Sequence, residues 1–190
     1  MTFPDEQQMV IEARRDPAAF RALYQRYLPR VYAYVAYRVG READAEDLTA
    51  DIFIKVVEGL AGFEDRGEGA FAAWVFRIAH NHVSQFYRQQ GQLAVSFDEL
   101  PDIASESPTP ETLYQRQEQF NRLRQRIANL SPRRQEIVTL RFFGELRNNE
   151  IAEVLGLDER TVAAHLCRAI EDLQRQYEPE IDRKQNELEP

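Results

Sequence analysis

One segment without a basic side chain constrains the organisation of the whole chain. Residues 91–115 contain 5 acidic residues and no basic one, and Pro101, Pro108 and Pro110 fall within ten positions. Each proline removes a backbone N–H and pushes the residue before it toward extended geometry. Loops of this length are uncommon inside a compact domain. We therefore expect a linker between two domains, with a long loop inside a single domain as the alternative.

The net charge of −8 at first argues against nucleic acid as a partner. All of the acidic excess lies in two places, the segment 91–115 and residues 177–190, which hold 5 acidic residues against 2 basic ones. Residues 1–90 and 116–176 each hold 11 basic residues, against 13 and 9 acidic ones, and are close to neutral. The overall charge therefore does not exclude a nucleic-acid partner.

The composition predicts a cytoplasmic protein without membrane insertion. Hydrophobic residues make up 43% of the 190 positions, which is enough for a core. The longest nearly apolar stretch, residues 31–39, is far shorter than the ~20 residues of a membrane span, and the N-terminus lacks the pattern of a signal peptide. A single cysteine, Cys167, excludes an internal disulfide and fits a reducing compartment. We expect this cysteine to be buried or half-buried.

Both near-neutral blocks have apolar residues at helical spacing and no convincing strand alternation, which predicts an all-α fold of two small helical domains. Asp16 followed by Pro17 is typical of a helix start, as is Ser131 followed by Pro132. In the first block we expect helices from Pro17, from Pro29 to near Gly40, over about 44–60 and over about 70–90. In the second block we expect helices over about 111–129, from Pro132 to Gly144, over 149–155 and over 158–176.

Residues 149–162 have the pattern of a helix-turn-helix. Ala152 is small where two helices would cross, Gly156 can adopt the left-handed turn conformation, and Val162 would fill the core. The second helix would then place its first turns in a DNA major groove. The alternative is an ordinary helical hairpin. The candidate DNA-facing side chains of this helix are Arg160, Thr161, His165 and Arg168.

Aromatic and basic side chains alternate along residues 71–88, and no acidic residue lies between Glu68 and Asp98. Aromatic stacking and cationic contacts are what hold single-stranded bases. We nevertheless expect the apolar side chains at helical spacing to belong to the core, because most apolar stripes along a helix are buried. These positions are Phe71, Trp74 and Ile78. Four polar residues are exposed at their spacing and fit a DNA-binding face and a solvated surface equally well; they are Arg77, Asn81, Gln85 and Arg88.

The sequence does not indicate an enzyme, a metal centre or a cofactor. His80 and His82 are two positions apart and point to different faces of a helix, and no metal tetrad, phosphate-binding glycine loop or nucleophile constellation occurs.

Several motifs, in this order, resemble a bacterial RNA polymerase sigma factor of the extracytoplasmic-function (ECF) group. The resemblance covers roughly residues 16–177. The motifs are residues 44–53, Phe71-x-x-Trp74-x-x-Arg77-Ile78-Ala79-x-Asn81, Leu130-Ser131-Pro132, Glu150-Ile151-Ala152-x-x-Leu155-Gly156, and Thr161-Val162.

The resemblance implies a protein that binds core RNA polymerase, directs it to specific promoters and melts DNA for transcription initiation. It implies a domain at 5–90 for the polymerase clamp and proximal element, a linker at 91–112, a helix-turn-helix domain at 113–177 and an acidic tail at 178–190. An anti-sigma protein is left open as a partner.

The resemblance also assigns roles to residues. The polymerase-binding residues would be Asp47, Asp51 and Lys55. The loop from Phe63 to Gly69 would receive an unstacked base. The proximal-element residues would be Phe63, Arg77, Asn81, Gln85 and Arg88, and the distal-element residues would be Arg160, Thr161, His165 and Arg168.

The recognition helix departs from the family pattern, in which a basic residue, a serine and an arginine usually follow Thr-Val. This chain has Ala163, Ala164 and His165 there, so its charge is weaker. We therefore expect the chain to bind DNA poorly by itself. Two alternatives remain, a helix-turn-helix regulator that acts without polymerase and a degenerate sigma-like protein with weak DNA reading.

Overall fold

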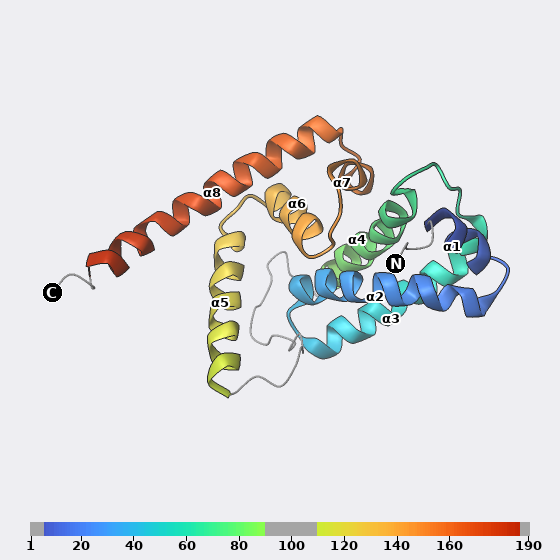
Figure 1. Cartoon of the computed structure of the whole chain (residues 1–190), viewed down its shortest axis with the longest axis horizontal. Helices are drawn as coiled ribbons and strands as arrows, with labels where there is room; N and C mark the ends of the chain where they lie inside the picture. The colour runs from blue at the N-terminus through green and yellow to red at the C-terminus, as the bar shows by residue number, and fades with distance from the viewer. Residues whose placement is uncertain (1–5, 90–109, 187–190) are drawn as a thin grey trace. The chain divides into compact units, whose positions relative to one another are not determined.

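The computed structural model describes residues 6–89 and 110–186, and every regular element among them is a helix (Figure 1). This confirms the all-α prediction for the described residues. The helices are α1 (Glu6–Ala13), α2 (Pro17–Val39), α3 (Glu42–Gly59), the short 3₁₀ turn η1 (Leu60–Gly62), α4 (Ala70–Gln89), α5 (Pro110–Ala128), α6 (Pro132–Phe142), α7 (Asn148–Leu155) and α8 (Glu159–Asn186). Most of the predicted linker, 91–112, lies outside the described residues.

The chain forms two compact units, and the boundary between them falls within α6 and at the start of α8. The first unit contains Met1–Pro101 and Thr139–Glu159. The second contains Asp102–Val138 and Arg160–Pro190. Helix α7 therefore belongs to the same compact unit as α1–α4. Within the described residues, no helix combines the length and the apolar character that a membrane crossing requires.

Helix α2 starts as predicted. The side chain of Asp16 accepts a hydrogen bond from the backbone N–H of Ala18 at 2.8 Å, and Pro17 occupies the first turn. The predicted restart at Pro29 is wrong, because a single helix continues through this proline to Val39. The residues on either side of Pro29 that face the core are all buried, and burying this continuous stripe outweighs the local cost of proline. They are Leu23, Tyr27, Val31, Tyr34 and Val35.

The core of the first unit is built where α2 packs against α1, α3 and α4. Edge-on aromatic contacts join Tyr27 to Phe71, with ring centroids 5.3 Å apart, and Tyr34 to Phe76 at 5.8 Å. All four rings are buried. Such contacts prefer a defined ring geometry, so they fix which face of α4 is turned outward.

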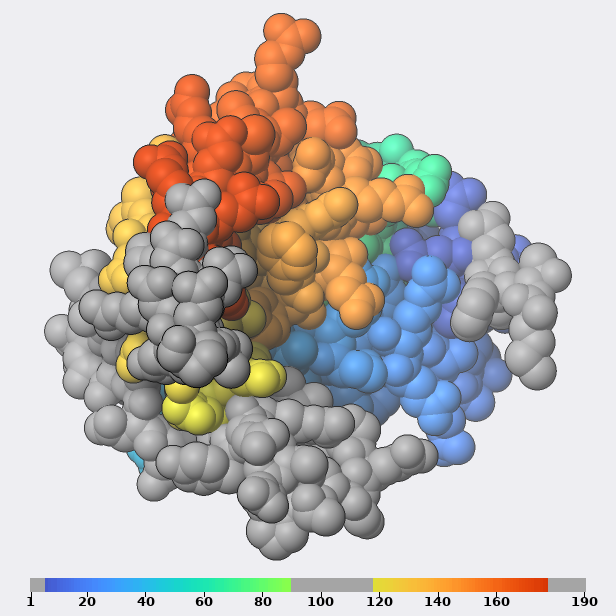
Figure 2. All heavy atoms as spheres, turned by 60° about the vertical axis from the view of Figure 1, so that its left-hand side comes forward, coloured from blue at the N-terminus to red at the C-terminus, as the bar shows by residue number. Residues whose placement is uncertain are grey.

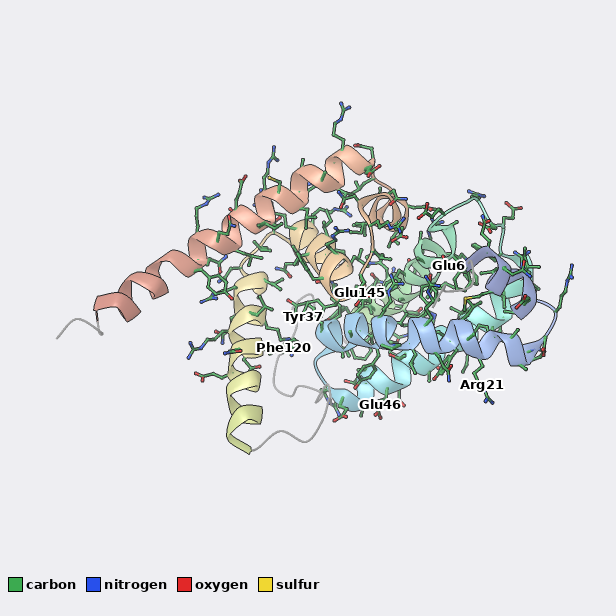
Figure 3. All side chains as sticks on the ribbon, in the orientation of Figure 1. Glu6, Arg21, Tyr37, Glu46, Phe120 and Glu145 are labelled. Carbon is green, nitrogen blue, oxygen red and sulfur yellow. The ribbon has the colours of Figure 1, made fainter. Side chains whose placement is uncertain are left out.

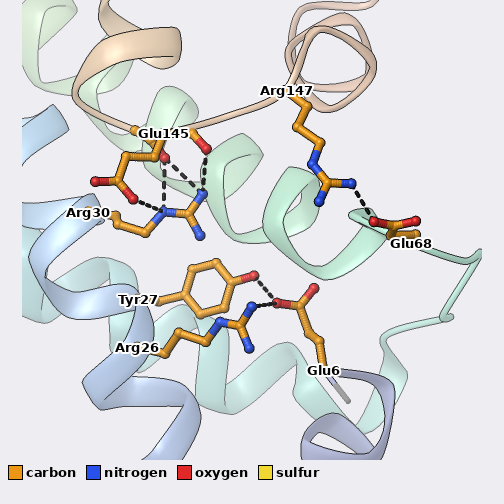
Figure 4. Close-up of polar contacts among 8 residues, drawn as sticks. Glu6, Arg26, Tyr27, Arg30, Glu68, Glu145 and Arg147 are labelled. Carbon is orange, nitrogen blue, oxygen red and sulfur yellow. Dashed lines mark hydrogen bonds and ion pairs between the residues drawn. The ribbon is translucent and has the colours of Figure 1, made fainter. Parts of the chain in front are cut away.

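Helix α1 was not predicted from the sequence. It packs on α2, and Met9, Val10 and Ala13 are its buried residues. Its first residue, Glu6, accepts a hydrogen bond from the Tyr27 hydroxyl at 2.6 Å (Figure 4). Burial, followed by the charge of Glu6, raises the pKa of Tyr27. The helix has only eight residues and, unlike α7 of the same length, belongs to no motif recognised in the sequence.

Residues 139–159 contribute the end of α6, a connecting loop and α7 to the first unit, where α7 packs against α4. The carboxylate of Glu150 accepts a hydrogen bond from the backbone N–H of Arg147 at 2.7 Å, at the start of α7. Gly156 ends α7 with φ 65°, the left-handed conformation predicted for it. A bond from the N–H of Leu157 to the carbonyl of Ala152, at 2.9 Å, closes this turn.

The second unit joins α5, the start of α6 and α8. Arg134 forms an ion pair with Asp172, and the guanidinium of Arg126 lies 3.4 Å from the centroid of the Tyr177 ring. Val162 and Ala169 are fully buried. Helix α8 extends ten residues past the predicted end at 176, and much of its described length is open to solvent (Figure 2).

Replacing Pro29 with alanine is expected to stabilise the protein. A proline inside a helix lacks the N–H that would bond the carbonyl of Gln25, and its ring crowds that carbonyl, at a cost of about 3 kcal/mol. A thermal melt followed by circular dichroism should therefore show a higher Tm for Pro29→Ala. The matched control is Pro17→Ala, at a first-turn position where no hydrogen bond is lost. An equal or larger rise in the control would contradict this explanation.

Candidate nucleic-acid interface

Helix α4 separates a buried face from an exposed one. The residues Arg77, Asn81, Gln85 and Arg88 are all exposed. Of the three residues expected in the core, Phe71 is buried as predicted, whereas Trp74 and Ile78 are half-buried, because they border the polar row at three- and seven-residue spacing. Trp74 therefore keeps part of its ring at the surface beside the row of polar side chains.

The loop after η1, residues 63–69, is supported by aromatic side chains that pack on its inner side. Phe63 is only 7% exposed, and its ring lies 5.4 Å from that of Phe71 and 5.0 Å from that of Trp74. Arg14, just after α1, donates from Nε to the carbonyl of Leu60 at 3.2 Å, and its guanidinium lies 5.7 Å from the Phe63 ring centroid. Phe63 thus supports the loop from inside, and a direct contact between Phe63 and DNA stays a prediction.

A hollow of about 360 Å³ opens between this loop and α4. The half-buried indole of Trp74 offers an aromatic surface, and Arg66 and Arg77 place two guanidinium groups beside it, paired with Glu64 and Glu153. An aromatic surface beside cationic groups is what sequence-tolerant binding of a single-stranded base needs. The residues that line the hollow are Gly62, Phe63, Glu64, Arg66, Ala70, Trp74, Arg77 and Glu153.

The predicted polymerase-binding residues Asp47, Asp51 and Lys55 are exposed on α3. Lys55 donates to Glu58 at 2.7 Å, and this hydrogen bond is the main reason that the pKa of Lys55 is raised. Two apolar residues that the sequence analysis missed, Ile54 and Val57, lie among these charges and are 54% and 53% exposed. The signal that could have found them is their position outside the apolar face of the helix, next to its charged residues.

Each predicted distal-element residue lies near the start of α8. Arg160 and Arg168 are exposed, and Thr161 and His165 are half-buried. Thr161, His165 and Arg168 are spaced four and three residues apart, which places them on one face. Their spacing agrees with a shared binding surface, and their contact with DNA stays a prediction.

Cys167 is exposed, so the expectation of a buried or half-buried cysteine is wrong. Its thiol donates to the carboxylate of Glu171, one helical turn later, at 3.4 Å. This hydrogen bond, with the charge of Glu171, raises the pKa of the thiol. The misprediction arose because small size alone was taken to favour burial.

Two segments of the chain match described families. Residues 23–92 match Sigma-70 region 2, and residues 120–173 match Sigma-70 region 4. The RNA polymerase sigma factor YlaC of Bacillus subtilis is 31% identical over 154 residues, which cover 77% of this chain and 85% of YlaC. The chain belongs to the ECF RNA polymerase sigma factor family. Members of this family direct RNA polymerase to promoters and are not themselves enzymes.

A second relative is similar over most of this sigma factor. The ECF RNA polymerase sigma factor BldN of Streptomyces coelicolor is 34% identical over 158 residues, 83% of this chain. The chain spans only 60% of the length of BldN.

A solved structure shares the fold. The sigma factor RpoE of Bartonella quintana, crystallised with the anti-sigma factor NepR, matches with a TM-score of 0.61 at 20% identity. The match covers 82% of this chain and 94% of RpoE.

The family matches divide the candidate residues between two regions. The region 2 match contains α3, the loop and α4, and the region 4 match contains the start of α8. Helix α1 and Arg14 precede the region 2 match. The support that Arg14 gives to the loop is therefore a feature of this chain outside the matched segments.

Arg14→Ala is expected to loosen the loop and expose Trp74. The substitution removes the bond to Leu60 and the contact over Phe63, against which the indole packs. Because Trp74 is the only tryptophan in the chain, acrylamide quenching of its fluorescence reports on this loop alone, and quenching should increase. Arg15→Ala, an exposed neighbour, should leave it unchanged. Equal quenching in both variants would show that Arg14 does not support the loop.

Proposed function

We propose that this sigma factor binds core RNA polymerase and directs it to specific promoters, where it also assists melting. The observation that carries the proposal is the hollow beside Trp74 and the polar face of α4, in a chain that also contains region 4. One region would hold a separated strand while the other reads duplex DNA. Transcription initiation needs both tasks, whereas a repressor that acts by occupying its DNA site needs only to read duplex DNA.

Melting is driven by binding energy. Extruding a base from the duplex costs a few kcal/mol, and stacking it on an aromatic ring returns about 1–3 kcal/mol. Trp74 supplies the aromatic surface, and Arg66 and Arg77 attract the phosphates beside the extruded base. The exposed residues of α4 continue this track along the proximal element.

Affinity for the polymerase comes from α3. The charges of Asp47, Asp51 and Lys55 set the orientation of docking, and the exposed side chains of Ile54 and Val57 contribute apolar area at the centre of the contact. Apolar groups surrounded by charges are the usual composition of a protein interface.

The distal element is read by Arg160, Thr161, His165 and Arg168. Only two of these side chains are permanently charged, so the electrostatic part of DNA binding is small. The segment 91–112 acts as the linker between a domain at 5–90 and a domain at 113–177, with a tail at 178–190. This arrangement lets a large polymerase present both domains to one promoter.

The proposal places the sigma factor in the cytoplasm and requires no cofactor. A protein that sequesters it is a further partner of this function. RpoE of Bartonella quintana is crystallised with the anti-sigma factor NepR, and its similar fold supports an anti-sigma partner for this chain.

Reconstitution with core polymerase tests the proposal, and Asp51→Arg tests the surface on α3. The wild-type chain should associate with core and produce promoter-specific transcripts. Reversing the charge at Asp51 should weaken association by about tenfold or more, because like charges placed opposite each other cost several kcal/mol. Glu12→Arg makes the same charge change on α1 and should retain binding. Failure of the wild-type chain both to bind core and to direct transcription would contradict the function.

The double substitution Ala163→Lys, His165→Arg is expected to strengthen promoter binding by the holoenzyme. Each added phosphate contact should steepen the dependence of log affinity on log salt by about one. Gln174→Lys, an exposed position farther along α8, is the control. Unchanged affinity would remove the start of α8 from the DNA interface. Binding of a palindromic site by a dimer of the free chain would instead favour the regulator alternative.

A further inference from the structure

The first turns of α8 carry charged and uncharged groups that differ in what they can recognise on DNA. Arg160 and Arg168 are exposed cations, whereas His165 is half-buried and Ala164 beside it is exposed. Side chains project from the side of α8 that is turned away from α5 (Figure 3). A cation on phosphate carries no sequence information, but a hydrogen-bonding ring beside a methyl group can read the edge of a base.

Contacts farther along α8 fix how this helix is rotated. Asp172 forms an ion pair with Arg134 of α6. Gln176 accepts a hydrogen bond from Asn129 at 3.4 Å. Asp172 and Gln176 follow His165 by seven and eleven positions, so all three lie on the same side of the helix. His165 therefore stands where the packed side of α8 meets its open side.

The two ring nitrogens of His165 differ in their surroundings. Nδ1 is buried and has no hydrogen-bond partner among the described residues. Nε2, at the other edge of the ring, is not enclosed in this way. Protonation of Nδ1 would bury an N–H without an acceptor and, in a ring that already carries a proton on Nε2, a positive charge as well.

This arrangement favours a neutral ring with its proton on Nε2. In that tautomer the open edge of His165 is a single hydrogen-bond donor, because Nε2–H donates and cannot accept. A neutral donor makes no ionic contact with phosphate, but it can donate to an acceptor on a base. It excludes cytosine, whose major-groove edge presents only the N4 amino donor.

Ala164 supplies a second, apolar element of recognition. It is exposed and directly precedes His165, and its methyl side chain cannot form a hydrogen bond. Among the four bases, only thymine presents both a methyl group, on C5, and an acceptor, O4, at its major-groove edge. A donor beside a methyl group is the complement of that edge.

We propose that the start of α8 reads a thymine in the distal promoter element. Nε2–H of His165 donates to O4, and the methyl group of Ala164 packs against the C5-methyl. This inference rests on the proposed function, in which α8 lies in the major groove. His165 is then a specificity-determining residue, and Arg160 and Arg168 provide phosphate contacts on either side of it.

Promoter selection by the reconstituted holoenzyme tests which base is read. The probe is a pool of duplex DNA of random sequence. The wild-type holoenzyme should enrich a distal element with a fixed thymine. His165→Arg should change that thymine to guanine, because a guanidinium pairs with O6 and N7 of guanine, and should leave the other positions unchanged. Gln174→Arg places the same side chain at an exposed position farther along α8 and should enrich the wild-type element.

Replacing the fixed thymine with deoxyuridine removes only the methyl group of the base. The wild-type holoenzyme should bind the deoxyuridine duplex about fourfold more weakly, the effect expected for one buried methyl group. Ala164→Gly removes the methyl group of the protein, and the ratio of its affinities for the two duplexes should fall to one. Any loss of helix stability in this variant affects both duplexes equally and cancels in the ratio.

The salt dependence of binding separates a base contact from a phosphate contact. His165→Ala should weaken binding of the enriched duplex about fivefold, the effect of one neutral hydrogen bond, without changing the slope of log affinity against log salt. Arg168→Ala should instead reduce that slope by about one.

The tautomer of His165 can be measured in the full-length chain without DNA. Long-range ¹H–¹⁵N correlation spectra distinguish a ring protonated on Nε2, on Nδ1 or on both nitrogens. His165→Gln identifies its signals among those of the 3 histidines. We expect the Nε2–H form at neutral pH, and a proton on Nδ1 would overturn the proposal.

The outcomes separate the thymine contact from the proposed function. An enriched element that His165→Arg leaves unchanged, or equal binding of the thymine and deoxyuridine duplexes by the wild type, would overturn the thymine contact and leave the sigma factor function intact. Failure of the wild-type holoenzyme to enrich any element would overturn both. If His165→Arg enriches no element, the deoxyuridine ratio and the tautomer decide. A change from thymine to guanine in His165→Arg alone, with the proton on Nε2, supports the proposal.

Discussion

The aromatic contact between α2 and α4 determines how the first unit presents its surface. Tyr27 and Tyr34 lie two turns apart on α2 and meet Phe71 and Phe76 edge-on, with all four rings buried. Edge-to-face pairs have a preferred geometry in addition to their apolar area. Rotation of α4 would break both pairs, so its polar row faces outward and Trp74 lies at the boundary between core and solvent.

This boundary is also where positive and negative charges compete. The chain has a net charge of −8, yet the groups around the hollow include both arginine and glutamate. An acid beside a cation lowers the cation's attraction for phosphate. Weak DNA binding by the free chain, expected from the sequence because its recognition helix has few charges, thus gains a second physical cause in the pairing of Arg77 with Glu153.

Long periodic helices, their start signals and the short helix α7 could be predicted from the sequence, whereas α1 and the continuous course of α2 could not. The helices over about 44–60 and 70–90 were expected within two residues of their observed bounds. The continuous helix through Pro29 was not expected. Local rules for proline take no account of the buried apolar residues that precede and follow it in α2. No prediction was made for the exposed Ile54 and Val57, because single apolar residues at a protein surface are common and do not by themselves indicate a binding site.

The sequence by itself determined the family, the helical content and the order of the motifs, since these depend on residue types at fixed local spacing. Only the tertiary structure decided which of the candidate side chains are free to act. Phe63 is buried under its loop, Arg77 is paired with Glu153 from a distant part of the chain, and α7 packs with α4. Contacts between residues 76 positions apart depend on how helices pack, and no local pattern in either helix encodes them.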